Sequence, residues 1–146
     1  MSSNAPLYDT DFFAWANEQA ALLRAGRLSE ADVANIAEEI ESMGRGEKRE
    51  LESRLAVLLL HLLKWRYQPG FRGNSWRLTI EEQRYQVADH LRDNPSLRSV
   101  LDESYRRAYR RARLEAAQET GFDPGSFPET CPFAVEEATS PDFWPD

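Results

Sequence analysis

The chain has a single cysteine, Cys131, among its 146 residues. One cysteine excludes a disulfide within the chain and a zinc site built from several cysteines. This scarcity is typical of proteins in a reducing compartment. We therefore expect a cytoplasmic protein.

Long apolar runs are also missing. The longest nearly apolar stretch, residues 55–63, is interrupted by His61 and is much shorter than the ~20 residues that span a bilayer. The first ten residues lack the basic and apolar regions of a secretory signal. The sequence predicts a protein that is neither membrane-spanning nor secreted.

Histidine is scarce too, with only His61 and His90. A di-metal site in a helical bundle uses Glu-x-x-His pairs on two helices. Leu58 and Val87 stand three residues before the two histidines, so neither histidine has such a pair. We expect no metal and no cofactor.

Charge is abundant but unevenly placed. The net charge is −7. Residues 1–53 carry 11 acidic and 5 basic side chains. Residues 54–113 carry 6 acidic and 13 basic side chains, and residues 114–146 carry 8 acidic side chains and no basic one. A basic middle between acidic ends indicates either ends that fold against the middle or a basic surface for an anionic partner. We favour the first interpretation, and the overall acidity disfavours nucleic acid.

Apolar residues recur at helical spacing along most of the chain. They predict an all-α bundle of about five helices in a single domain, residues 1–146, with the bundle over 9–121 and a tail over 122–146. The third helix, Glu47 to Trp65, is apolar nearly all round, which predicts that it lies at the centre. Glycines mark the expected ends of three helices, at Gly26, Gly44 and Gly121.

The predicted first helix begins after Asp9 or Thr10, and the predicted fifth helix follows Asn94 and Pro95. The tail is rich in proline and in aromatic residues. A disordered tail is rarely so aromatic, so we expect it to lie against the bundle with a short helix near residues 133–138. Cys131 is expected to cap that helix.

Six segments resemble a bacterial family known as Domain of Unknown Function 29, and the likeness runs from Tyr8 to Trp144. They are residues 8–15 (YDTDFFAW), 37–44 (AEEIESMG), 51–55 (LESRL), 61–65 (HLLKW), 75–84 (SWRLTIEEQR) and 128–133 (PETCPF). The resemblance implies an α-helical fold in a bacterial protein. It implies no reaction.

Arg54 and His61 lie seven residues apart on the predicted central helix. This spacing is about two turns and puts both on one face. The pair resembles the arginine–histidine motif of HEPN-type ribonucleases, in which arginine stabilises phosphate charge and histidine acts as acid or base without a metal. The alternative, which we favour, pairs Arg54 with an acid such as Glu38 or Glu41 and makes His61 a hydrogen-bonded core residue.

The segment that follows alternates basic and aromatic side chains around a glycine-containing turn. Such a pattern suits single-stranded nucleic acid, whose bases stack on rings and whose phosphates meet cations. It also suits the end of a bundle where tryptophans close the core, and we favour that interpretation. The candidate binding residues are Lys64, Trp65, Arg66, Tyr67, Arg72, Trp76 and Arg77.

Two functional hypotheses follow. The preferred one is a non-enzymatic interaction module that binds an unknown protein partner or a second copy of itself. The alternative is a metal-independent, HEPN-like ribonuclease or RNA-binding bundle that uses Arg54, His61 and the segment from Lys64 to Arg77.

Overall fold

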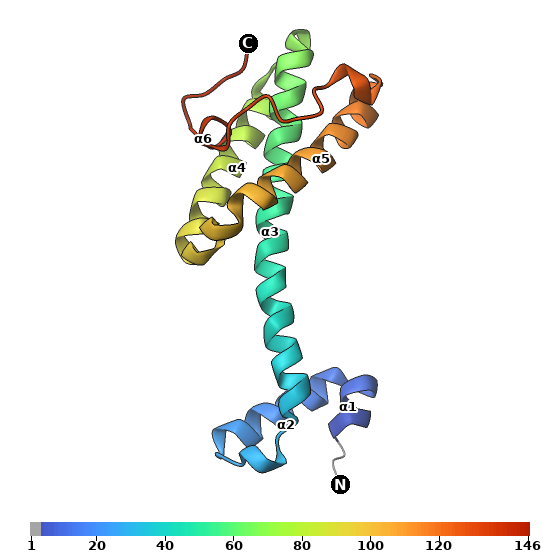
Figure 1. The fold of residues 1–146 in the computed structure, drawn as a ribbon, viewed down its shortest axis with the longest axis vertical. Coiled ribbons are helices and arrows are strands. Elements are labelled where there is room, and N and C mark those ends of the chain that lie inside the picture. The colour runs from blue at the N-terminus through green and yellow to red at the C-terminus, as the bar shows by residue number, and fades with distance from the viewer. Residues whose placement is uncertain (1–3) are drawn as a thin grey trace. The chain divides into compact units, whose positions relative to one another are not determined.

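The computed structural model describes residues 4–146, which form helices joined by turns and loops, with no strand among them. The helices are α1 (Asn4–Thr10), α2 (Phe12–Arg24), α3 (Val33–Tyr67), α4 (Asn74–Asp93), α5 (Leu101–Thr120) and α6 (Val135–Ala138). Short 3-10 turns join them at Leu28–Glu30, Pro69–Phe71, Pro95–Val100 and Pro124–Ser126. The all-α prediction is confirmed, and Figure 1 shows the course of the chain. Of the helices described, none is long and apolar enough to cross a membrane.

The chain divides into two compact units, Met1–Gly46 and Glu47–Asp146. The first holds α1, α2 and the beginning of α3. Its buried centre is Trp15, whose indole donates a hydrogen bond of 3.1 Å to Asp32. The Asp32 backbone N–H donates in turn to the side-chain oxygen of Gln19 at 2.7 Å. These bonds tie α2 to the start of α3.

The prediction that the first helix begins after Asp9 or Thr10 is wrong. The chain is already helical at Asn4, and the break falls at Asp11, which separates α1 from α2. The Asp11 carboxylate accepts a hydrogen bond from the backbone N–H of Ala14 at 3.1 Å. It is therefore the N-cap of α2, because it satisfies one of the free N–H groups of the first turn.

The prediction of a helix end at Gly44 is also wrong, because α3 is one helix of 35 residues that runs through this position. Only two of the glycines in the described structure adopt positive φ, Gly26 at 72° and Gly121 at 76°. A glycine ends a helix when it turns left-handed, as Gly121 does at the end of α5. Gly44 stays right-handed, where it costs about 1 kcal/mol of helix propensity without breaking the helix.

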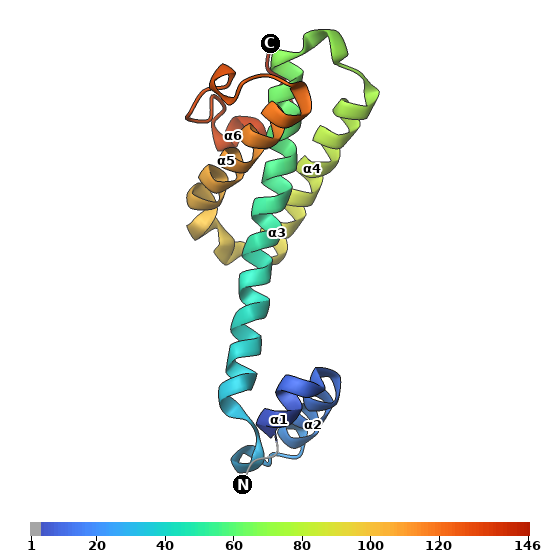
Figure 2. The same ribbon diagram turned by 90° about the vertical axis from the view of Figure 1, so that its right-hand side faces the viewer.

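The second unit has a core centred on α3, as the sequence predicted. Figures 1 and 2 show α4 and α5 running along the part of α3 that belongs to this unit. α5 presents small alanines to the core, which lets helices pack closely. The fully buried leucines of α3 are Leu51, Leu55, Leu58, Leu59, Leu62 and Leu63.

The aromatic tail packs on this core, which confirms the prediction. Phe127 and Phe133 are buried, and the Phe127 ring meets the Tyr67 ring edge-on with centroids 5.0 Å apart. Buried Arg84 of α4 donates hydrogen bonds to the carbonyl oxygens of Ala138 at 2.8 Å and Phe143 at 2.6 Å. The tail is thus held by packing of its aromatic rings and by hydrogen bonds from the Arg84 guanidinium to its backbone carbonyl groups.

The expected short helix is present as α6, but Cys131 does not cap it. The residue at the N-cap position is Ala134, whose backbone N–H is bound by the Glu137 carboxylate at 3.0 Å. The Cys131 thiol is half-buried and lies 3.5 Å from the Tyr105 hydroxyl. Cys131 therefore belongs to the contact between α5 and the tail.

Candidate functional site

Arg54 has a partner on its own helix. Its Nε donates a hydrogen bond of 3.1 Å to Oε2 of Glu50, one turn earlier in α3. The expected partners Glu38 and Glu41 were therefore the wrong choice, although pairing with a glutamate was the right kind of contact. The Arg54 side chain is 31% exposed, so part of it still reaches solvent.

His61 is half-buried and also bonds within α3. Its Nδ1 lies 2.8 Å from the Val57 carbonyl oxygen, which can only accept, so Nδ1 carries the proton. Burial lowers the pKa of His61 below its usual value. At neutral pH the ring is uncharged, and Nε2 holds its free lone pair.

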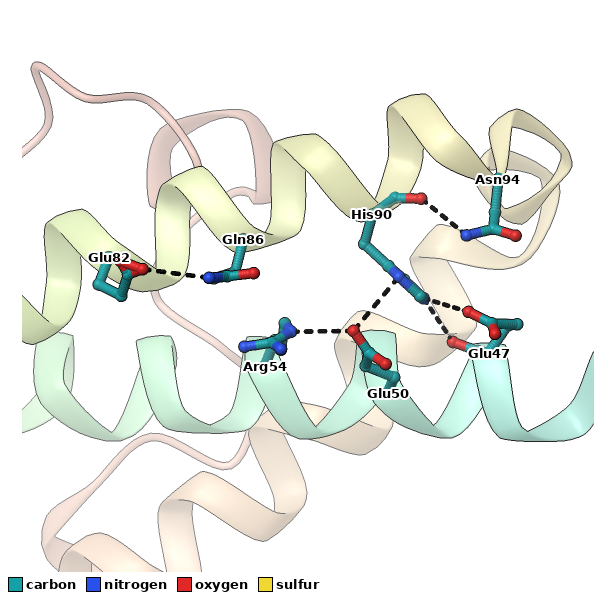
Figure 3. Close-up of polar contacts among 7 residues, drawn as sticks. All are labelled: Glu47, Glu50, Arg54, Glu82, Gln86, His90 and Asn94. Carbon is teal, nitrogen blue, oxygen red and sulfur yellow. Dashed lines mark hydrogen bonds and ion pairs between the residues drawn. The ribbon is translucent and has the colours of Figure 1, made fainter.

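The structure links Arg54 to the other histidine (Figure 3). Oε2 of Glu50 accepts from Arg54 and also lies 3.4 Å from Nδ1 of His90 on α4. Nε2 of His90 donates to the backbone carbonyl of Glu47 at 2.8 Å and lies 3.5 Å from a carboxylate oxygen of the same residue. We call Glu47, Glu50 and His90 the histidine–glutamate cluster.

Sequence reasoning missed this cluster. Its histidine and Glu47 are 43 positions apart, and the search for metal ligands used only spacings within one helix. One signal was available. His90 lies three residues after Val87 and next to Leu91, which are both apolar, so its side chain falls on the apolar side of this helix.

Lys64, at the head of the predicted binding segment, is buried. Its Nζ donates to Glu119 of α5 at 2.7 Å and lies 5.0 Å from the centre of the Trp76 ring. The lysine thus joins α3 to both α4 and α5. Its charge is balanced inside the unit.

The turn around Arg72 anchors the tail. The Arg72 guanidinium donates to the carbonyl oxygens of Trp65 at 2.7 Å and Pro145 at 3.3 Å, and it stacks over the Trp65 ring at 5.3 Å. The Trp65 ring also packs against Trp144, with ring centroids 4.7 Å apart. Arg72, Trp65 and Trp144 are thus engaged with one another and with the backbone of the chain.

The remaining candidates in the segment lie nearer to solvent. Arg66 is exposed, with its guanidinium 5.8 Å from the Tyr67 ring. Arg77 is exposed and pairs with Glu81 one turn on, at 3.2 Å. Nucleic-acid binding by this segment stays a prediction.

A cavity of about 530 Å³ lies between α5 and the tail. Tyr109 and Cys131 are among its lining residues. Burial raises the pKa of the Tyr109 hydroxyl to about 12 and raises the pKa of the Cys131 thiol. Both groups are protonated at neutral pH, so Cys131 is no activated nucleophile.

A large part of the exposed apolar surface belongs to the first unit. Seven of the twelve large apolar side chains with the highest exposure fall within Met1–Gly46. We call them the N-terminal apolar surface: Phe12, Phe13, Leu23, Leu28, Val33, Ile40 and Met43.

The chain was compared with curated proteins, with solved structures and with models of protein families. Searches of curated proteins and of solved structures found no match. A family model described as "Domain of unknown function DUF29" matches residues 7–144. The match agrees with the six segments identified in the sequence and covers nearly the whole chain. This chain belongs to the DUF29 family.

Proposed function

We propose that this protein is a non-enzymatic interaction module whose N-terminal unit binds a second copy of the chain. The observation that carries the proposal is a stripe on α3, formed by Val33, Ile36, Ile40 and Met43, which we call the α3 stripe. Its spacing of three, four and three residues is that of a helix seam. Val33, Ile40 and Met43 are 64%, 59% and 66% exposed, so the described chain leaves the stripe largely uncovered.

The exposed area is of the size that a stable interface needs. At roughly 150–250 Å² for a large side chain, the N-terminal apolar surface leaves about 700 Å² open to solvent. A standard interface buries about 800 Å² on each partner. The area is a sum over seven side chains, of which those of the α3 stripe are neighbours on one helix face. Adjoining exposed apolar side chains on soluble proteins mark interaction sites.

Charge along α3 favours a second copy over an unrelated partner. Within the first unit, Glu38, Glu39 and Glu41 precede Arg45. An antiparallel arrangement of two copies brings Arg45 of each chain opposite the glutamates of the other, and the contact closes with two-fold symmetry. Arg45 pairs with Glu38 in its own chain at 2.8 Å, but both side chains are more than half exposed, so exchanging this pair costs little.

Gly44 provides independent support. It lies inside α3, where it weakens the helix, and a Cβ added there would meet no atom within 4 Å. Packing within the chain therefore gives no reason for glycine at this position. Because glycine has no side chain, a second helix can approach the backbone of α3 closely at this position, next to Met43.

The test is the mass of the full chain in solution at about 50 μM, measured by light scattering. We expect twice the 16.8 kDa of one chain, and we expect Ile40→Asp to give the single-chain mass. The matched control is Leu114→Asp, because Leu114 of α5 is 56% exposed and lies outside the N-terminal unit. A single-chain mass for the wild type, or a dimer that survives Ile40→Asp, would contradict the proposal.

The ribonuclease hypothesis has less support. Arg54 shares Glu50 with His90, and Nδ1 of His61 is engaged by the Val57 carbonyl. A direct test is cleavage of labelled single-stranded RNA in the presence of chelator. The hypothesis requires activity that His61→Gln abolishes in a chain that is still helical.

A further inference from the structure

We infer that the histidine–glutamate cluster is a binding site for one divalent transition-metal ion, with zinc as the best fit. The site joins α3 to α4 and is separate from the N-terminal apolar surface. The inference therefore does not depend on dimerisation.

The first argument is geometric. One ligand atom from each of Glu47, Glu50 and His90 lies within 4.8 Å of the other two. Nδ1 of His90 lies 3.4 Å from Oε2 of Glu50, which is longer than the usual 2.7–3.2 Å of a hydrogen bond. It equals the edge of a tetrahedron, about 3.4 Å, around a metal with bonds of about 2.1 Å.

The second argument is that His90 is already oriented as a ligand. The side chain is 8% exposed, and its Nε2–H donates to the Glu47 backbone carbonyl at 2.8 Å. Metal-binding histidines commonly donate their second ring N–H to a carbonyl or carboxylate, which fixes the tautomer. The remaining nitrogen, Nδ1, points its lone pair toward the Glu50 carboxylate (Figure 3).

A lone pair that faces a carboxylate is repulsive unless a cation lies between them. Two cations can fill this place, a proton on Nδ1 or a metal ion. The third group favours the metal, because a proton needs only the Glu50 carboxylate, whereas Glu47 offers a further, half-exposed carboxylate oxygen 3.5 Å from Nε2 of the same ring. The two glutamates also give an ion access from solvent.

The donor set selects the class of ion. One imidazole nitrogen with two carboxylates suits zinc and related transition metals, whereas calcium and magnesium prefer oxygen ligands alone. Three protein ligands leave a fourth position for water. We therefore expect binding weaker than that of a closed structural zinc site with four protein ligands.

Arg54 tunes the site without binding the ion. Its guanidinium holds Oε2 of Glu50 at 3.1 Å and so fixes the carboxylate, but its positive charge opposes a cation nearby. Removing the charge with Arg54→Gln should tighten metal binding. A purely structural salt bridge gives the opposite expectation, since losing it frees Glu50 to move.

The experiment is calorimetric titration of the full chain with Zn²⁺ after dialysis against chelator, with Co²⁺ absorption as a second measurement. We expect one ion per chain. Binding should weaken at least about tenfold in His90→Gln and in Glu50→Gln, and tighten in Arg54→Gln. The Co²⁺ spectrum of the wild type should show nitrogen–oxygen coordination that His90→Gln removes.

His61→Gln is the matched control, because it removes the other histidine and leaves the cluster intact. Circular dichroism verifies that each variant is helical, and Glu50→Gln keeps the test valid if His90→Gln does not fold. Absence of saturable Zn²⁺ binding by the wild type, or equal binding by His90→Gln and His61→Gln, would overturn the inference. The cluster would then be a set of polar contacts that only joins α3 to α4.

Discussion

The two units differ in how they use their apolar residues. Among the described residues of Met1–Gly46, only Trp15 and Gln19 are buried, whereas Glu47–Asp146 buries the leucines of α3 together with residues of α4, α5 and the tail. Both units contain well-formed helices, but a helix without a buried face gains little stability of its own. A short unit that buries so few residues has little core of its own, whereas the larger unit has a full one.

The sharpest way to test this difference is to make the same leucine-to-alanine truncation in each unit. Leu59 is fully buried in the second unit, so Leu59→Ala should lower the free energy of unfolding by about 3 kcal/mol. Leu23 of α2 is 44% exposed, and Leu23→Ala should change it by less than about 0.5 kcal/mol. Urea unfolding followed by circular dichroism measures both, and equal losses would show that the contrast between the units is false.

The next largest effect concerns the attachment of the tail. Arg84→Met should cost about 2 kcal/mol, because it leaves the carbonyl groups of Ala138 and Phe143 without their donor. Chymotrypsin should then cut after Phe143 faster than in the wild type. Arg77→Met is the control, since Arg77 makes only exposed contacts with Glu81 and Asn74. Equal cleavage rates in the two variants would mean that Arg84 does not hold the tail.

A smaller effect should appear in the pH dependence of the second unit. Burial lowers the pKa of His61 below its usual value of about 6.5, so the unfolded chain takes up a proton at a higher pH than the folded chain. The free energy of unfolding is therefore highest above about pH 6.5, where His61 is uncharged in both states. It decreases as the pH falls from there through the pKa of His61 in the folded chain. Urea midpoints between pH 5 and 8 should therefore fall with acid less steeply in His61→Gln. Identical slopes would contradict the prediction.

The smallest effect on the main unfolding transition is expected from Trp15→Ala. Trp15 is the buried centre of the first unit and bonds Asp32, so hydrogen exchange in α2 should accelerate strongly. The urea midpoint of the second unit should stay unchanged. A midpoint that shifts as far as in Leu59→Ala would show that the two units unfold together.

Much of the fold followed from apolar spacing. The leucines that made residues 47–65 the expected centre of the bundle are buried, and the aromatic tail packs where its composition predicted. The spacing did not reveal that α3 continues through Gly44, because the backbone angle of a glycine is decided by its surroundings and not by its identity. The break at Asp11 was missed because Asp9, Thr10 and Asp11 can each cap a helix, and the sequence does not select among them.

The candidate sites were harder to predict, because they depend on contacts between distant segments. Lys64 and Arg72 were identified as cations near aromatic rings, but their partners Glu119 and Pro145 lie 55 and 73 positions away. The same holds for His90 and Glu47. A periodic pattern identifies which face of a helix is buried, but not which polar group it meets there.

The order in which the core is completed has a consequence for biosynthesis. The leucine face of α3 is translated well before Phe127, Phe133 and Trp144, which cover part of this core. At about 5–20 residues per second, the ribosome leaves the nascent core unfinished for several seconds. During that time its leucines are substrates for chaperones. A message truncated after Gly121 would yield a chain that never closes this core, and we expect the cell's proteases to remove it.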